Sequence, residues 1–223
     1  MCGRYTLTTP GPELIETFEA SGPNFEWSGR YNIAPGQQAP VVAEDRHGRR
    51  VGLLTWGLVP AWMDEPRPGI VNARGESVMT KRSFREAFHR RRCLVPATGF
   101  FEWSREGDAR TPWWFHPAGG ETLAFAGLWE RWSRGDVEPR HTFTIITTQA
   151  SPDVARVHER MPLLLRGPDR DAWLDRASSP RRLAAILHAP PAVSLEGHAV
   201  SRRVNRVDAD DRSLLEPLDA APT

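Results

Sequence analysis

Cysteine is almost absent from this sequence, because only Cys2 and Cys93 occur among its 223 residues. Two cysteines are too few for the disulfide framework of a small secreted domain. Long apolar runs are also missing, and none approaches the ~20 residues that a membrane-spanning helix needs. The first five residues lack the apolar core of a secretory signal. We therefore expect a soluble protein of the reducing cytoplasm and not a membrane protein.

Neither sign of charge dominates. The chain has 29 basic and 28 acidic residues, which gives a formal net charge of +1. A nucleic-acid site needs local positive charge and not a basic chain, so any such site here would be a groove that folding assembles. The histidines and cysteines show none of the paired spacings of a zinc site, and we expect no metal and no cofactor.

Long uninterrupted helical patterns are missing as well. The 20 prolines and 18 glycines favour many short elements. We expect strands at 51–56, 71–73, 93–96, 100–103, 113–115, 122–125, 142–147 and 193–200, and helices at 13–18, 83–92, 169–175 and 180–188. This pattern predicts an α+β fold with a mainly antiparallel, curled or barrel-like sheet and flanking helices. We expect a single domain over residues 1–217, followed by a frayed tail at 218–223.

Among the residues that are present, Cys2 carries the most chemical information. Removal of the initiator methionine would leave its α-amine beside its thiol, with reference pKa values of about 7.7–8.0 and ~8.5. The amine can condense with an aldehyde, and the thiolate can then close a five-membered thiazolidine ring. The alternative is an accidental cysteine at a disordered terminus. The run Gly3-Arg4-Tyr5 argues against it, since a disordered tail has little need for such residues.

A single carboxylate stands in the aromatic run from Gly99 to Trp103. Strand alternation places Glu102 on the same face as Phe100. Apolar neighbours raise the pKa of a carboxyl group, which suits a general acid or base near neutral pH. The alternative is an exposed glutamate on an edge strand.

A histidine and an amide complete the set of catalytic candidates. His158 precedes Arg160 by two residues in an extended segment before Pro162, so the two side chains should point the same way. Histidine is the usual proton carrier at neutral pH, although a surface histidine in a loop is the alternative. Asn72 could orient a reacting group or stabilise an oxyanion, or it could simply hold a turn.

Several basic and aromatic residues could line a DNA groove. Arg85 follows Arg82 by one turn if both lie on the expected helix, and its guanidinium could bind a phosphate. Trp56 could stack on an unpaired base, a contact that contributes roughly 1–3 kcal/mol, although most of the nine tryptophans should serve packing. The DNA-binding candidates are Arg4, Pro35, Trp56, Arg74, Arg85 and Arg160.

Seven segments, in this order and spacing, resemble the SOS response-associated peptidase (SRAP) family of abasic-site proteins. Each segment is weak alone, but together they run from residue 1 to about residue 206. They are Met1-Cys2-Gly3-Arg4-Tyr5, Tyr31-Asn32-Ile33-Ala34-Pro35, Trp56-Gly57-Leu58-Val59-Pro60, Asn72-Ala73-Arg74-Gly75-Glu76, Arg92-Cys93-Leu94-Val95-Pro96, Gly99-Phe100-Phe101-Glu102-Trp103 and His158-Glu159-Arg160-Met161-Pro162. The segment 200–205 follows the family pattern only loosely, which leaves one edge of the expected groove open.

The resemblance implies a β-rich SRAP fold with a positive groove for single-stranded DNA. It implies that Met1 is removed, by the chain itself or by an aminopeptidase, and that Cys2 traps an abasic sugar as a thiazolidine. Such a crosslink would shield the site from strand cleavage in the SOS response to DNA damage. The resemblance assigns an orienting amide to Asn72, an acid/base role to Glu102 and a sugar-facing role to His158. It also implies a monomer associated with DNA in the nucleoid, with peptidase-like self-processing and lyase-type chemistry.

Two alternatives stay open from the sequence. A cysteine peptidase would use Cys2 as nucleophile and His158 as base, on its own chain or on other proteins, and turnover of peptides in trans would favour it. A non-covalent module for single-stranded DNA would bind in a salt-sensitive way and form no covalent product.

Overall fold

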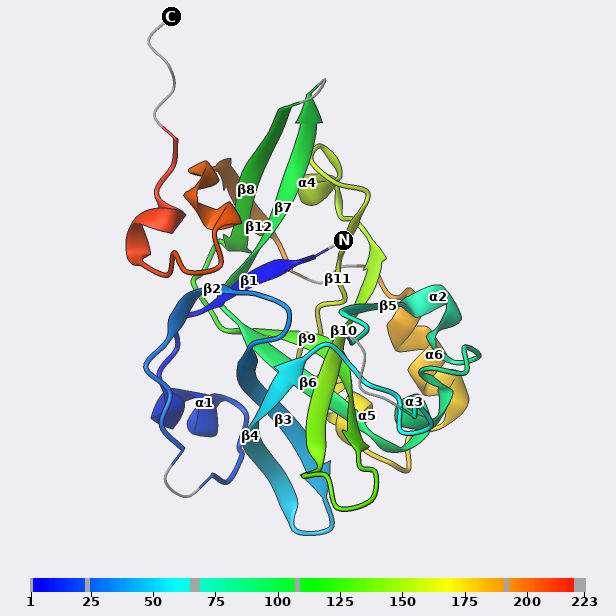
Figure 1. The fold of residues 1–223 in the computed structure, drawn as a ribbon. Coiled ribbons are helices and arrows are strands. Elements are labelled where there is room, and N and C mark those ends of the chain that lie inside the picture. The colour runs from blue at the N-terminus through cyan, green and yellow to red at the C-terminus, as the bar shows by residue number, and fades with distance from the viewer. Residues whose placement is uncertain (1, 23–24, 65–68, 107–108, 191–192, 219–223) are drawn as a thin grey trace, which may run out of the picture.

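The computed structural model describes residues 2–22, 25–64, 69–106, 109–190 and 193–218, arranged around two sheets (Figure 1). The smaller sheet has five strands in the order β12-β8-β7-β1-β2, and all of its pairings are antiparallel. Its strands are β1 (Arg4–Leu7), β2 (Arg30–Ile33), β7 (Gly99–Glu106), β8 (Ala109–Pro117) and β12 (Leu195–Ala199).

The larger sheet curls into a closed ring. Its order is β11-β10-β4-β3-β6-β9, and β9 also pairs with β10, while β5 adds to β10 in parallel. The ring therefore confirms the predicted barrel-like sheet, with a parallel pairing of β4 and β10 among antiparallel ones. The strands are β3 (Gln38–Asp45), β4 (Gly48–Trp56), β5 (Asn72–Arg74), β6 (Arg92–Ala97), β9 (Leu123–Trp132), β10 (Arg140–Gln149) and β11 (Arg160–Pro162).

The helices are short, as the many prolines predict, and several begin with proline in their first turn. Figure 1 shows α2, α3, α5 and α6 gathered on one side of the larger sheet, with η1 and η2 beside β8 and β12. Within the part of the chain that is described, none of these helices has the length and apolar character to cross a membrane. The helices are α1 (Gly11–Thr17), α2 (Gly75–Val78), α3 (Arg85–Arg90), α4 (Pro152–Ala155), α5 (Pro168–Leu174), α6 (Pro180–His188), and the 3₁₀ turns η1 (Arg202–Asn205) and η2 (Arg212–Leu215).

The strand β7 separates two hydrophobic clusters. Phe100 belongs to the main core, where its ring stacks on Phe115 with centroids 5.5 Å apart. Phe101 belongs to a smaller cluster with Val204 and Leu214 from the 3₁₀ turns. Alternation along β7 therefore turns successive aromatic rings into different clusters, and the even-numbered face, which carries Glu102, looks toward the main core.

The expected helix over 83–92 is shorter than predicted. Its observed range is Arg85–Arg90, because Phe84 is buried just before it and Arg92 already belongs to β6. Arg82 lies in the preceding turn with its guanidinium 4.2 Å from the centre of the Trp62 ring, so it does not share a helical turn with Arg85. The Arg92 guanidinium is buried as well and donates to the carbonyls of Trp173 and Phe88.

The two ends of the chain are only partly described. Met1 and residues 219–223 lie outside the described residues, so the frayed tail stays a prediction there. Leu218, which we placed in that tail, donates its backbone N–H to the Ala199 carbonyl over 2.8 Å.

Candidate active site

The start of the chain is built into the smaller sheet. β1 lies between β2 and β7, and Arg4 pairs with Phe101, so the residues just before Arg4 run alongside Glu102. Cys2 has 0% of its surface exposed. The sequence alternative of a cysteine on a disordered terminus is therefore wrong, because the paired strand holds the segment in place.

Asn72 connects this terminus to the larger sheet. Its side-chain amide donates to the Cys2 carbonyl over 2.8 Å. Asn72 begins β5 opposite Ile145 of β10, and the preceding carbonyl of Val71 accepts from the Trp56 indole over 3.0 Å. The Asn72 carbonyl oxygen Oδ1 is buried and accepts no hydrogen bond from the described residues. The Nδ2 of this amide thus holds Cys2, and its Oδ1 can accept a hydrogen bond from a bound molecule.

Glu102 lies on a central strand and is only 1% exposed. The alternative of an exposed edge-strand glutamate is therefore wrong. Burial raises the pKa of Glu102 to about 7. Both protonation states are populated near neutral pH, so this one carboxyl group can donate a proton and accept one back.

The environment of the Cys2 thiol differs from the free group assumed in the sequence analysis. Burial, and then the neighbouring Glu102 carboxylate, raise the pKa of the Cys2 thiol well above its ordinary value. The thiol is therefore protonated at neutral pH, and its hydrogen points to the Arg4 carbonyl 3.5 Å from Sγ. A reaction at this sulfur needs a base that removes the proton.

His158 lies between α4 and β11, and its ring approaches the carboxyl group of Glu102. The backbone of Arg160 holds His158 Nδ1, because its N–H lies 3.0 Å and its carbonyl oxygen 3.1 Å from that nitrogen. Burial lowers the pKa of His158, so the neutral ring prevails at neutral pH. Nδ1 is 3.9 Å from Glu102 Oε2, which is too long for a hydrogen bond but close enough for electrostatic coupling.

Arg160 is ordered by two neighbours. Its guanidinium forms a two-point ion pair with Glu76 of α2, and one of these contacts spans 3.0 Å from Nη2 to Oε2. The same Nη2 donates to the Thr147 carbonyl over 2.7 Å, and only 13% of the side chain is exposed. Glu76 therefore fixes the arginine beside His158.

The remaining DNA-binding candidates lie in different settings. Arg74 is exposed at the end of β5, two residues after Asn72. Arg85 is exposed on α3, which packs against β6 and β9, whereas the catalytic candidates come from β5, β7 and the segments before β1 and β11. The Arg4 guanidinium donates to carbonyls near the C-terminus. All three assignments stay predictions.

A cavity of about 600 Å³ adjoins Asn72 and includes Pro35, Trp56 and Val71 in its lining. Pro35 is exposed at this cavity, but Trp56 is only 1% exposed and presents no ring face for base stacking. The exposed Arg140 lines the same cavity, and our sequence analysis missed it. Its signal in the sequence was a basic residue two positions before the expected strand at 142–147.

The arrangement is one of acid/base and nucleophilic groups. Among the described residues, there is no group of three or more histidine, cysteine, aspartate and glutamate side chains that could hold a metal ion. A buried carboxyl group, a neutral imidazole, an amide and a buried cysteine instead meet between the two sheets. Such a set can protonate a leaving oxygen and add a nucleophile to a carbonyl carbon.

Comparison with known proteins places this arrangement in a family. A protein of Bacillus subtilis (strain 168) named abasic site processing protein YoqW is 34% identical over 222 residues, which cover 97% of this chain and 99% of that protein. Abasic site processing protein YedK of Escherichia coli (strain K12) is 30% identical over 226 residues, covering 98% of this chain and 100% of that protein. A crystal structure of a protein from Bacteroides thetaiotaomicron superposes with a TM-score of 0.84 at 21% identity, over 97% of this chain and 100% of the other, and so shares the fold. The SOS response associated peptidase (SRAP) family matches residues 1–207, and this chain belongs to that family.

Proposed function

We propose that this protein processes abasic sites in DNA by forming a covalent thiazolidine between Cys2 and the abasic sugar in a single strand. The observation that carries the proposal is the burial of Cys2 beside Glu102, with Asn72 and His158 completing the site. The names of the related proteins support the substrate class. The product would keep the abasic site from strand cleavage.

DNA would be seated by arginines around the mouth of the site. Arg74 is exposed next to Asn72, and Arg160 lies next to His158, so phosphates on either side of the missing base would find one guanidinium each. Arg160 would exchange Glu76 for a phosphate oxygen. Arg85 and Arg140 would extend the contact along the strand, with Pro35 at the rim of the adjoining cavity.

The sugar must open before it can react. Glu102 in its protonated form donates its proton to the ring oxygen while the anomeric hydroxyl gives its proton to solvent water, which converts the closed hemiacetal into the free aldehyde. The raised pKa of Glu102, about 7, provides a protonated fraction at neutral pH. His158, whose lowered pKa keeps its ring neutral, is suited to orient the sugar hydroxyls by hydrogen bonds.

The α-amine of Cys2 then attacks the aldehyde carbon. Addition gives a carbinolamine, and loss of one water leaves an iminium at C1′. Glu102 again protonates the departing hydroxyl. Before this step Glu102 regains its proton from the solvent or from the amine. Asn72 holds the Cys2 carbonyl during this step and fixes the direction of the amine.

Ring closure uses the thiol of the same residue. The Glu102 carboxylate removes the proton from Sγ, and the sulfur adds to the iminium carbon to form the five-membered ring. The raised pKa of the Cys2 thiol makes this base necessary. The balance is one aldehyde plus one aminothiol giving one thiazolidine and one water.

Removal of Met1 is the prerequisite, since a peptide nitrogen cannot form the iminium. Hydrolysis of the Met1–Cys2 bond consumes one water, and we assign the activation of that water to Glu102. Intact mass of protein purified as wild type and as Glu102→Gln tests this step. Retention of Met1 only in the variant supports self-processing, whereas its loss from both assigns the step to an aminopeptidase.

A peptidase that acts on other proteins is the weaker reading of the site. A polypeptide substrate would have to reach a sulfur that has 0% exposure and whose pKa is raised. The sugar of one abasic nucleotide is smaller than a peptide chain. Binding of that sugar is therefore easier to reconcile with this burial than binding of a polypeptide. Turnover of peptides in trans would overturn this view.

The test of the proposal is incubation with single-stranded DNA that carries one abasic site, followed by heat and denaturing electrophoresis. Wild type should give one heat-stable adduct, and Cys2→Ala should give none. The same strand with an intact base at that position is the matched control and should give no adduct with either protein. A heat-stable adduct of equal yield from Cys2→Ala would refute the role of Cys2, and salt-sensitive binding without any adduct would favour the non-covalent module.

A further inference from the structure

Arg4 lies two residues from Cys2, yet its guanidinium is directed into the C-terminal part of the chain. Its Nη1 donates to Asn32 Oδ1 over 2.9 Å and to the Val204 carbonyl, and its Nη2 donates to the Asn205 carbonyl over 3.0 Å. A guanidinium engaged by three neutral acceptors is anchored in place. To bind a phosphate it would have to leave several buried acceptors without a donor.

Asn32 is the centre of this contact. Its side chain is completely buried in β2, and its amide Nδ2 donates to the carbonyls of Val204, Arg206 and Ala209 over 3.2, 2.9 and 2.8 Å. Its Oδ1 accepts from Arg4. Both ends of this one amide are therefore occupied, and they join β1 to η1 and the turn that follows it.

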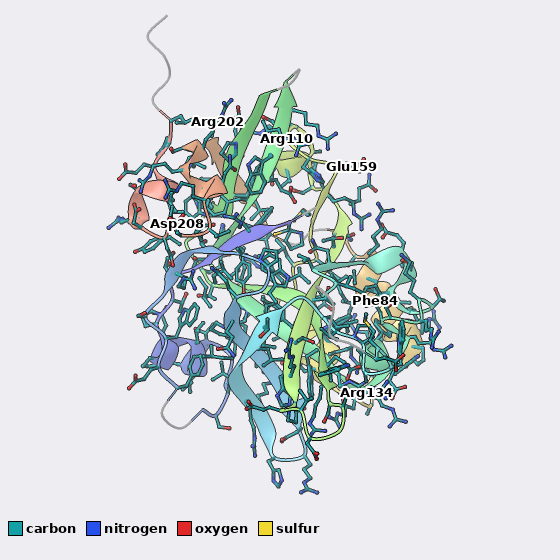
Figure 2. All side chains as sticks on the ribbon, in the orientation of Figure 1. Phe84, Arg110, Arg134, Glu159, Arg202 and Asp208 are labelled. Carbon is teal, nitrogen blue, oxygen red and sulfur yellow. The ribbon has the colours of Figure 1, made fainter. Side chains whose placement is uncertain are left out.

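Asp210 closes the same contact from the other side. Its carboxylate accepts from the backbone N–H groups of Tyr31 and Asn32 over 2.6 and 3.0 Å and pairs with Arg30. The segment 201–210 is thus held to β1 and β2 by backbone and side-chain contacts along its length. Figure 2 shows Arg202 and Asp208 of this segment at the surface on the side of β8, so the charges that face solvent differ from those that face the strands.

We propose that Arg4 and Asn32 are positioning residues, which hold the start of β1 through the segment 201–210 and so keep Cys2 against Glu102. We call these contacts the C-terminal clasp: Arg4, Asn32, Asp210 and the carbonyls of Val204, Asn205, Arg206 and Ala209. The proposal rests on the proposed function only for its catalytic consequence. In it, Arg4 serves the site by anchoring the strand and not by binding a DNA phosphate.

The physical reason is the precision that ring closure demands. Two bonds must form to one carbon from a single residue, and a displacement of about 1 Å costs on the order of a hundredfold in such a reaction. Cys2 precedes the paired part of β1, where strand ends fray most readily. The hydrogen bonds of the Arg4 guanidinium fix Arg4, which is the first paired residue of β1. They therefore limit how far Cys2 can move.

Access to the Cys2 thiol provides a test that needs no DNA. Alkylation by iodoacetamide forms one C–S bond with loss of HI, and peptide mapping follows Cys2 and Cys93 separately. Cys93 is buried in β6, so its alkylation reports unfolding of the whole core. The variants are Asn32→Ala and Arg4→Lys, which keeps the charge but loses the planar fork. Arg203→Ala is the matched control, since Arg203 lies in the segment 201–210 and the change removes its exposed ion pair with Asp211 and no clasp contact.

The clasp predicts that both variants expose Cys2 to alkylation at least about tenfold faster, the size of effect expected when a buried polar network loses a member. Cys93 should stay protected, and Arg203→Ala should match wild type. With abasic DNA, the rate of adduct formation at saturating strand should fall in the same two variants, while affinity for intact single-stranded DNA stays within about twofold.

Unchanged protection of Cys2 in Asn32→Ala would overturn the proposal. So would an Arg4→Lys protein that matched wild type in alkylation, because charge alone would then suffice. If Asn32→Ala exposed both cysteines together, Arg4→Lys would decide between the two outcomes. A wild-type protein that formed no adduct, together with variants that exposed Cys2 alone, would refute the proposed function and leave the clasp standing.

Discussion

Glu102 combines two requirements that oppose each other in most proteins. It must be buried to have a useful pKa, and it must stay near reacting atoms that need a proton. Its place on a central strand of the smaller sheet meets the first requirement, and the approach of Cys2 along β1 meets the second. At the scale of single residues, the proposed chemistry therefore carries a cost in stability that a neutral side chain would remove.

Glu102→Gln should remove the cost in stability and, with it, the proposed acid/base group. Since burial raises the pKa of Glu102 to about 7 from 4.5, the folded protein binds a proton that the unfolded chain has released between these values. Wild type should therefore lose stability as pH rises from about 4.5 to 7 and then level off, because the unfolded state binds fewer protons there. The variant should lack this loss and be more stable at pH 8 by roughly 2–3 kcal/mol.

Urea unfolding at pH 5 and pH 8 measures both proteins, and the rate of adduct formation should fall at least about a hundredfold in the variant. A variant that is less stable than wild type at pH 8 would show that the carboxylate is stabilised by its surroundings and would contradict the pKa direction. Wild-type adduct rates in Glu102→Gln would remove the proposed acid from the mechanism.

Glu76→Gln should strengthen binding of single-stranded DNA if Arg160 contacts a phosphate. The ion pair with Glu76 competes with DNA for the same guanidinium, and its loss should raise affinity about two- to fivefold at low salt. Because half of the Glu76 side chain is exposed, the change in unfolding free energy should stay below about 1 kcal/mol.

Fluorescence anisotropy with an intact single strand measures the affinity. Glu159→Gln is the matched control, since it removes the same charge from an exposed neighbour of Arg160 (Figure 2). Equal gains in both variants would point to net charge alone, and no gain in Glu76→Gln would exclude Arg160 as a phosphate contact.

At the scale of elements, the packing of β7 on β8 depends on a residue without a side chain. A Cβ at Gly99 would lie 2.4 Å from the Trp114 indole nitrogen and 2.7 Å from the Phe115 carbonyl. Three residues further along the same strand is Glu102. Strain at the start of β7 would therefore reach the acid/base group through the backbone.

Gly99→Ala should lower the free energy of unfolding by at least about 1–3 kcal/mol and slow adduct formation. Gly52→Ala in β4 is the matched control, because a Cβ there meets nothing within 4 Å, and it should be neutral or stabilise by up to about 1 kcal/mol. Urea unfolding of both variants measures the difference. Equal stability of the two would contradict the tight contact between β7 and β8.

The elements that the sequence predicted best are those whose pattern is local. The apolar runs of β6, β9 and β10 and the proline-started helix α6 follow from alternation, composition and capping. The closure of the ring through the parallel pairing of β4 with β10 does not, because register between distant strands leaves no local mark. The same reason explains why Glu102 could be proposed as an acid while its burial, which sets its pKa, could not be derived.

The contacts of the C-terminal clasp could not be predicted from the sequence. Asn32 entered the sequence analysis only as part of a segment that resembles the family, and 200–205 only as a segment that follows the family pattern loosely, since nothing in either indicates the other. A buried amide is recognised only when its partners are known, and here the carbonyls that accept from it lie more than 170 residues away. The raised pKa of the Cys2 thiol escaped notice for the same reason.

At the scale of the whole molecule, a net charge of +1 makes DNA binding a matter of local arrangement. Contacts from Arg74, Arg85, Arg140 and Arg160 to four phosphates should give a slope of about −3 for the logarithm of the binding constant against the logarithm of salt concentration. Anisotropy titrations with intact single-stranded DNA between low and physiological salt measure it. A slope near zero would exclude a phosphate-binding groove, and charge-reversal at Arg202 should leave the slope unchanged.

The most direct measurement is the intact mass of the purified product after reaction with abasic single-stranded DNA. The account predicts one species whose mass equals the chain without Met1 plus the oligonucleotide, less one water, with the modification mapping to the peptide that begins at Cys2. An adduct that retains Met1, or one that maps to another residue, would contradict it.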